Sequence, residues 1–250
     1  MGVRAAALVI ALAAAAGRVV GAPPPAPRAV TALADVPSAI VQIVSLRART
    51  AGARTRHGSA FYVSAQGHLL TCFHVLDRMP REDAPRLRRS DGREQRFEVV
   101  GVDRETDLAL LRSDPPETFL LLGDEPRPAV GARVIFAGVA ARAEDTADAP
   151  TVSFQRCAVA ALETRRAPRS RRAVANVKLD HIAEPGISGG PLLAEGTLVV
   201  VGVMRANLER TTGGIAGERP TGHGLAVPLL YVRSFLQELL AEEPASRLYR

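Results

Sequence analysis

Short apolar runs, separated by clusters of Gly, Pro and Asp, recur along this chain of 250 residues. They occupy residues 40–46, 97–102, 108–111, 134–139 and 198–204. Runs of this length bounded by turn-forming residues are typical of the strands of a β-barrel or β-sandwich. The pattern therefore predicts an all-β fold, and 250 residues are enough for one domain of this kind.

The spacing of apolar residues changes near the C-terminus. Leu229, Val232, Leu236 and either Leu239 or Leu240 fall on one face if residues 228–242 form a helix. We therefore expect a C-terminal helix at about 228–242, followed by a tail at 244–250. The leucine stripe is expected to contact the core rather than to form a groove for a partner.

The N-terminus has the features of a secretory signal peptide. Arg4 supplies the charge, residues 5–16 are apolar, and Val20-Gly21-Ala22 resembles a small-residue cleavage site. The apolar run is too short to span a bilayer comfortably, although an uncleaved anchor is the alternative. We expect a signal peptide at 1–22, a Pro-rich spacer at 23–36, and an exported, periplasmic or extracellular protein with no stable membrane span.

The composition and charge limit the classes of partner that we expect the protein to bind. Hydrophobic residues make up 47% of the chain but aromatic residues only 4%, so the core must be mainly aliphatic. The net charge is +6, and a cluster of arginines at 165–172 predicts an exposed loop. Such a loop could meet an anionic polymer or membrane surface, but a solvated loop is the simpler interpretation. No aromatic residues interleave the cluster, which disfavours nucleic acid.

The cysteines do not indicate a metal site. Cys72 and Cys157 can form at most one disulfide, which is the natural pairing in an exported chain. Both lie in expected buried strands of different parts of the fold, which favours two free thiols. No cluster of Cys and His has metal-ligand spacing, so we expect neither a metal nor a cofactor.

A serine in a glycine-rich turn is the main candidate for chemistry. Ser188 lies within Gly186-Ile187-Ser188-Gly189-Gly190, directly before an apolar stretch. Glycines allow close approach of a substrate and leave backbone N–H groups available to an anion. Ser188 is therefore a candidate nucleophile, and the amides of Gly186 and Ser188 are a candidate oxyanion hole. An ordinary glycine turn is the alternative.

A nucleophilic serine needs a base and a group that orients the base. His74 closes the apolar stretch 68–75, which predicts a histidine mounted at a strand end. Asp107 directly precedes the apolar run 108–111, where its carboxylate would be partly buried and could hold one imidazole tautomer. Each residue alone has a structural explanation. Together, in the order His, Asp, Ser and each beside an apolar run, they indicate a catalytic triad.

Seven segments carry a family resemblance: 58–64, 70–75, 106–111, 122–124, 131–134, 180–192 and 222–228. In order and spacing the chain resembles the chymotrypsin-like serine peptidases, most closely the protease domain of the bacterial HtrA/Deg group. The resemblance implies a domain at 37–243 with two six-stranded antiparallel β-barrels, at about 37–122 and 131–227. His74 and Asp107 would come from the first barrel and Ser188 from the second. It also implies a protein or peptide substrate and a possible homo-oligomer.

Two departures from the family qualify this expectation. Ile187 occupies a position that is usually Asn in the HtrA/Deg group and Asp in the digestive enzymes, where the Asp pairs with a newly cut N-terminus. Isoleucine cannot form that ion pair. The sequence therefore leaves open whether the loop that forms the oxyanion hole is ordered in the free protein. The PDZ domain usual in the group is not expected here. A catalytically silent peptide-binding domain is therefore the alternative function.

The resemblance also suggests a substrate pocket. In this fold the position six before the serine, here Ile182, helps to form the base of the pocket for the residue before the scissile bond. Val203 and Met204 would form another wall, and Arg205 would add a positive charge that repels basic side chains. We expect cleavage after small or medium apolar residues.

Overall fold

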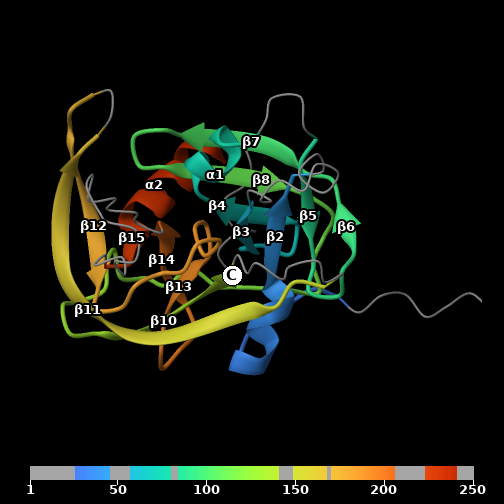
Figure 1. Ribbon diagram of the computed structural model, residues 1–250, viewed down its shortest axis with the longest axis horizontal. Coiled ribbons are helices and arrows are strands. Elements are labelled where there is room, and N and C mark those ends of the chain that lie inside the picture. The colour runs from blue at the N-terminus through green and yellow to red at the C-terminus, as the bar shows by residue number, and fades with distance from the viewer. Residues whose placement is uncertain are drawn as a thin grey trace, which may run out of the picture.

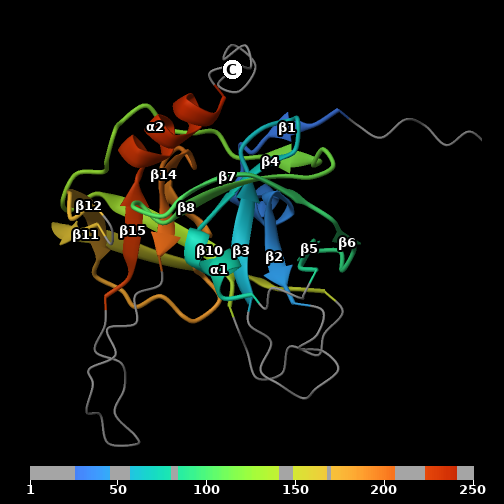
Figure 2. The same cartoon turned by 90° about the horizontal axis from the view of Figure 1, so that it is seen from above.

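The structure, a computed structural model, describes residues 26–45, 57–79, 84–140, 149–167, 170–205 and 223–240. The predicted signal peptide at 1–22 and tail at 244–250 lie outside the described residues. Two β-units make up the molecule, with a helix near the C-terminus (Figure 1). Both views place the hairpin of β11 and β12 at one end and strands β5 and β6 at the other (Figures 1 and 2).

The N-terminal unit is one antiparallel sheet in the order β6-β5-β2-β3-β4-β8-β7. Its strands are β2 (Ile40–Val44), β3 (His57–Tyr62), β4 (His68–Thr71), β5 (Arg86–Arg88), β6 (Glu94–Gln95), β7 (Glu98–Asp103) and β8 (Leu108–Arg112). The first of the two expected barrels is therefore present as a half-barrel. It has seven strands where six were expected, and β6 and β7 form its two open edges. Val99, Val100 and Val102 on the edge strand β7 are exposed.

The segment before this sheet is packed rather than extended away from it. Strand β1 (Arg28–Ala29) pairs in parallel with β9 (Thr118–Phe119), and a 3-10 helix, η1 (Leu33–Ala39), follows. Val36 of this helix is fully buried in the core. The part of the expected spacer from residue 28 onward therefore packs on the folded unit.

The C-terminal unit is a closed barrel of six strands, as predicted. Its order is β10-β11-β12-β15-β14-β13, with every neighbouring pair antiparallel. The strands are β10 (Arg133–Val139), β11 (Val152–Arg166), β12 (Ala173–Leu179), β13 (Pro191–Ala194), β14 (Val200–Arg205) and β15 (Leu225–Pro228). Aliphatic side chains dominate its interior, as the composition indicated.

The expected C-terminal helix is present as α2 (Leu229–Leu239). It buries Leu229, Val232 and Leu236, as its spacing predicted, and also Phe235. The helix contacts β14 and β15 of the barrel and also β7 and β8 of the N-terminal sheet. Helix α2 therefore joins both units through one continuous apolar cluster.

The two cysteines are free and buried, which confirms the favoured prediction. The thiol of Cys72 donates to the carbonyl oxygen of Met204 at 3.2 Å. Burial raises the pKa of the Cys157 thiol to about 12. Both thiols are therefore neutral near pH 7 and act as small apolar groups.

None of the described helices has both the length and the apolar character needed to cross a bilayer.

Candidate active site

His74 lies on a short helix and not at a strand end, which corrects the prediction. Strand β4 ends at Thr71, which pairs with Ala109 of β8, and His74 follows in α1 (Phe73–Asp77). The amide of Phe73 donates to the carbonyl oxygen of Asp107 at 3.1 Å, in the register of β4 with β8, so the start of α1 lies beside the turn that carries Asp107. Helix α1 lies about midway along the long axis of the molecule in both views (Figures 1 and 2). The His74 side chain is about a fifth exposed, at 22%.

Asp107 directly precedes β8, as predicted, in the turn that connects β7 to β8. Its backbone has φ 68°, in the left-handed region that residues other than glycine rarely adopt. The carboxylate is buried and contacts His74 twice. Its Oδ1 accepts from the His74 amide at 2.9 Å, and its Oδ2 lies 2.8 Å from the ring Nδ1. Strain at a buried residue with such contacts is typical of functional sites.

The contact between Asp107 and His74 fixes the imidazole tautomer. An ionised carboxylate can only accept hydrogen bonds, so Nδ1 of His74 must carry the proton. In the neutral ring, Nε2 is then the acceptor. This is the tautomer that can remove a proton from a hydroxyl group.

The environment of Asp107 keeps it ionised. Burial by itself raises the pKa of this carboxyl group. The hydrogen bond from the His74 ring, the charges of His74 and Arg205, and the bond from the His74 amide outweigh burial and hold the pKa of Asp107 below its usual range. Arg205 contributes directly, because its Nε donates to Oδ2 at 2.8 Å. Sequence reasoning placed Arg205 near the substrate pocket and missed this contact.

Ser188 lies in a turn that both units hold. Its carbonyl oxygen accepts from the amide of Ser59 in β3 at 2.8 Å, and the next amide, of Gly189, donates to Met204 in β14 at 2.8 Å. Gly189 has φ +86°, and a Cβ there would lie 2.1 Å from the carbonyl oxygen of Ser59. Only glycine fits this position. The turn is thus fixed between the N-terminal sheet and the barrel, with Ser188 itself 8% exposed.

The residues before Ser188 are held by Ser59 and by the barrel core. The Ser59 hydroxyl donates to the Gly186 carbonyl oxygen at 2.8 Å and accepts from the Val139 amide at 2.8 Å. Ile187 is 1% exposed and packs in the apolar cluster of the barrel. The apolar side chain that cannot form the ion pair of the digestive enzymes therefore anchors the loop by burial. The amides of the predicted oxyanion hole, Gly186 and Ser188, flank this anchored residue.

The three predicted pocket residues lie in different surroundings. Ile182 is 42% exposed, in the segment between β12 and the serine turn. Met204 is buried in the barrel cluster, whereas Val203 is buried in the cluster that includes α2. Adjacent residues of a strand face opposite sides, so Val203 cannot share a pocket wall with Met204. Asp180 has a structural role, because its Oδ1 accepts from the Ala158 amide at 2.8 Å.

The arginine cluster is part of a hairpin and is not simply a solvated loop. Arg165 lies at the end of β11, and its Nη2 donates to the carbonyl oxygen of Glu105 at 2.6 Å. Ser170, at the tip, contacts the Glu105 carboxylate through its amide and its hydroxyl group. Arg166, Arg171 and Arg172 are exposed, as predicted. The hairpin of the barrel thus reaches the turn that carries Asp107.

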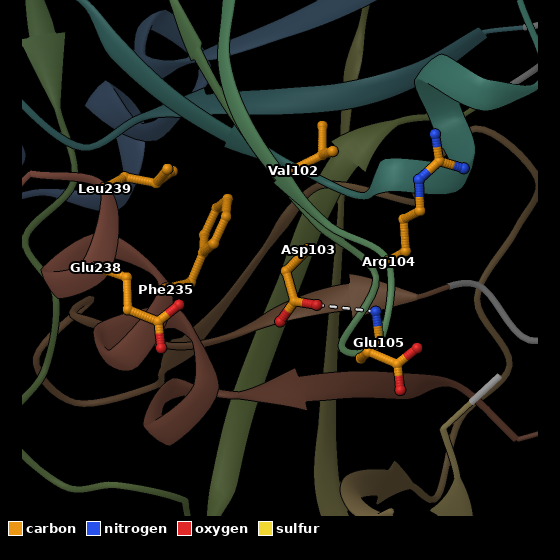
Figure 3. Close-up of a pocket in the computed structure, with 7 residues that line it drawn as sticks. All are labelled: Val102, Asp103, Arg104, Glu105, Phe235, Glu238 and Leu239. Carbon is orange, nitrogen blue, oxygen red and sulfur yellow. Dashed lines mark hydrogen bonds between the residues drawn. The ribbon is translucent and has the colours of Figure 1, made fainter. Parts of the chain in front are cut away.

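A surface hollow of about 430 Å³ lies next to this turn. Figure 3 shows its lining side chains, which come from the end of β7, the following turn and α2: Val102, Asp103, Arg104, Glu105, Phe235, Glu238 and Leu239. Asp103 accepts from the amide of Glu105 inside the turn. Neither His74 nor Ser188 lines the hollow, so we assign it no part in the chemistry.

Cys72, His74 and Asp107 are the one group of possible metal ligands among the described residues, with ligand atoms within 4.8 Å of one another. Their chemistry does not suit a cation. Burial and the charge of Asp107 raise the pKa of the Cys72 thiol well above its usual range, so it is not a thiolate. The guanidinium of Arg205 already neutralises the Asp107 carboxylate.

Comparison with known proteins identifies relatives of this chain. The chain is 30% identical over 198 residues to a probable periplasmic serine endoprotease DegP-like of Marinomonas sp., covering 78% of this chain and 38% of that protein. It is 27% identical over 189 residues to Protease Do-like 1, chloroplastic, of Arabidopsis thaliana, covering 73% and 39%. The chain therefore spans less than half the length of these relatives.

The fold also has a solved counterpart. The crystal structure of the serine endoprotease from Yersinia pestis matches 84% of this chain and 65% of that chain, with a TM-score of 0.60 and 21% identity. A family model described as the trypsin-like peptidase domain matches residues 58–203, more than half of the chain. The two β-units, the helix that joins them and this match together show that the chain belongs to the trypsin-like peptidase domain family.

Proposed function

We propose that the protein is a serine endopeptidase in which His74, Asp107 and Ser188 form the catalytic triad. The observation that carries the proposal is the double contact of Asp107 with His74, through the backbone amide and the ring Nδ1. A carboxylate held in this way orients the imidazole and stabilises the imidazolium that forms during acyl transfer. Ser188 lies in a turn fixed by both units, which supports its role as the nucleophile.

The proposed reaction needs no cofactor. His74 Nε2 takes the proton of Ser188 Oγ as the oxygen attacks the carbonyl carbon of the scissile bond. The resulting oxyanion is stabilised by the amides of Gly186 and Ser188, each worth roughly 3–4 kcal/mol in comparable sites. The protonated ring then gives its proton to the leaving amine, and an acyl-enzyme forms on Ser188. Water, activated by the same ring, hydrolyses this ester.

The alternative is a peptide-binding domain without catalytic activity. Ile187 motivated this alternative, but its burial gives the oxyanion loop an anchor of a different kind. A fluorophosphonate probe separates the two functions, because it labels a serine only when a neighbouring base activates it. We expect labelling at Ser188, accompanied by cleavage of a denatured protein substrate. A folded protein that neither reacts with the probe nor cleaves would favour the binding domain.

We further propose cleavage after small or medium apolar residues such as Val, Ala, Ile or Leu. Ile182 and Met204 offer no counter-charge to a basic side chain, and burying an unpaired Lys or Arg is costly. Within the apolar set the preference should be loose, because one methylene is worth only about 1–3 kcal/mol. Profiling a peptide library measures this directly. A dominant preference for Lys or Arg before the cut would refute the assignment.

We also propose that the protein is exported, as the N-terminal sequence predicts and as the name of the Marinomonas relative suggests for that protein. The mature chain is expected to begin at or near Pro23. Edman sequencing or mass spectrometry of protein recovered from outside the cytoplasm tests this. Soluble exported protein that retains Met1 would contradict the proposal.

A further inference from the structure

Arg205 is the last residue of β14, and this strand contacts the candidate site in two ways. The backbone of Met204 accepts from the Gly189 amide and donates to the Gly190 carbonyl oxygen, each at 2.8 Å. The side chain of Arg205 extends to the other unit, where Nε donates to Asp107 Oδ2 at 2.8 Å. Two adjacent residues thus contact the serine turn and the aspartate.

The guanidinium of Arg205 is itself held in place. Its Nη1 donates to the Asn176 side-chain oxygen in β12 at 3.3 Å, and Asn176 is only 2% exposed. The side chains of Arg205 and Asp107 are 23% and 8% exposed. A charge-assisted hydrogen bond in such a partly dry setting is stronger than an ion pair on the surface.

We propose that Arg205 is a positioning residue of the triad. It holds the Asp107 carboxylate in the orientation that accepts the Nδ1 proton of His74, and its charge extends activity to lower pH. The proposal rests on the serine peptidase function proposed above, in which Arg205 would act through Asp107 and would not touch the substrate.

The positioning role follows from the way in which His74 and Arg205 share the two carboxylate oxygens of Asp107. The His74 amide occupies Oδ1 of Asp107, and both the His74 ring and Arg205 bond to Oδ2. These three donors fix the rotation of the carboxyl group. Without Arg205, only His74 would oppose rotation of the Asp107 carboxyl group. The imidazole ring would then be held less firmly in its orientation.

The effect on pH follows from charge. The imidazolium that forms during the reaction bears the same charge as Arg205, which raises the cost of protonating the ring. Removing Arg205 therefore favours the protonated ring, which cannot act as a base. The acid limb of the pH profile of kcat/KM then moves to higher pH.

Other charged and titratable groups face the pair. Arg165 of β11 and Cys72 before α1 interact with both members of the pair, and further charges next to these two residues are Asp103 and Glu105 beside Arg165 and Arg78 beside Cys72. Arg165 bonds to the backbone of the turn and not to the carboxylate of Asp107, since its Nη2 donates to the carbonyl oxygen of Glu105. Burial, and then the charge of Arg205, lower the pKa of Arg165. Arg205 is thus the guanidinium in direct contact with Asp107.

The test compares the wild-type protein with Arg205→Met, which removes the charge and keeps a long side chain. We expect kcat to fall about tenfold to a hundredfold, the range for a lost hydrogen bond to a charged group. KM for a short peptide should stay within about twofold, because Arg205 does not touch substrate. The acid limb should move to higher pH, and the move should be smaller at high salt, which screens the charge of Arg205. A rise in KM with unchanged kcat would assign Arg205 to substrate binding and overturn the proposal.

Two control variants separate charge from structure. Arg205→Lys keeps the charge and should keep the acid limb, with an intermediate kcat; this variant decides the charge role if Arg205→Met does not fold. Arg156→Gln removes an arginine that pairs with Glu195 on the barrel surface, 62% exposed, and should leave the profile unchanged. An acid limb that is equal in wild type and Arg205→Met, or one that moves as far in Arg156→Gln, would refute the charge role.

A readout without turnover distinguishes failure of this proposal from failure of the proposed function. The proton between His74 Nδ1 and Asp107 should give a strongly downfield NMR signal in the wild-type protein. We expect the signal to broaden or vanish in Arg205→Met, because a looser carboxylate lets the proton exchange with water, and to persist in Arg156→Gln. If the wild-type protein cleaves nothing, the proposed function fails, yet the signal still tests positioning. An unchanged signal in Arg205→Met would overturn that role.

Discussion

Replacing Ser188 with alanine is expected to abolish peptide-bond cleavage and leave the fold intact. The hydroxyl group provides the attacking oxygen, and no other group can replace it in the acyl-enzyme. In comparable triads the loss is about a millionfold in kcat. Peptide hydrolysis by purified protein, with fluorophosphonate labelling as a second readout, measures the effect.

The fold should tolerate this change because the turn is held through its backbone. The Ser188 carbonyl oxygen bonds to Ser59, and Gly189 bonds to Met204; alanine preserves both contacts. His74→Ala should lose nearly as much activity, because the residues of a triad act as a unit. Circular dichroism and thermal unfolding supply the control. Wild-type turnover by a clean preparation of Ser188→Ala would exclude the mechanism proposed here.

Replacing Ile187 with aspartate should remove activity by a different route. Aspartate is the residue that the digestive enzymes carry at this position, where it pairs with a new N-terminus. In this protein the side chain is 1% exposed among apolar residues of the barrel, close to Gly138. Burying an unpaired carboxylate there should lower the free energy of unfolding by at least about 3 kcal/mol. Urea unfolding monitored by circular dichroism measures this cost.

The same substitution should also disorder the oxyanion loop, because Ile187 lies between the two amides that are proposed to bind the oxyanion. Residual folded protein is therefore expected to show weak or no fluorophosphonate labelling. Ile187→Val is the matched control: it removes one methylene, should cost about 0.5–1.5 kcal/mol, and should keep activity. If Ile187→Asp were as stable and as active as the wild-type protein, burial of Ile187 would not be what orders the loop.

The sequence determined the class of fold and the main candidates for chemistry. Strands appear as apolar runs between turn residues, and helix α2 appears as a leucine stripe, because these patterns are local. The turn around Ser188 could also be recognised from the sequence, because its backbone adopts positive φ angles that glycine allows. Asp107 could be placed before β8 from the apolar run that follows it.

Contacts between distant segments were decided only by the tertiary structure. His74 lies beside Asp107 because the start of α1 contacts the turn before β8, where the amide of Phe73 donates to the carbonyl oxygen of Asp107, 34 positions further along. Val36 belongs to the core because η1 packs on a sheet formed by later residues. The pattern of apolar residues could not specify either packing arrangement.

The role of single side chains depends most on such contacts. Ile187 suggested a missing ion pair in the sequence, whereas in the fold it is a buried anchor. Arg205 suggested a charge near the substrate pocket, whereas its Nε bonds to Asp107. A residue type fixes what a side chain can do, such as bury area or donate hydrogen bonds. Which partner it meets depends on chain segments brought together from both β-units, and that is set by the tertiary structure alone.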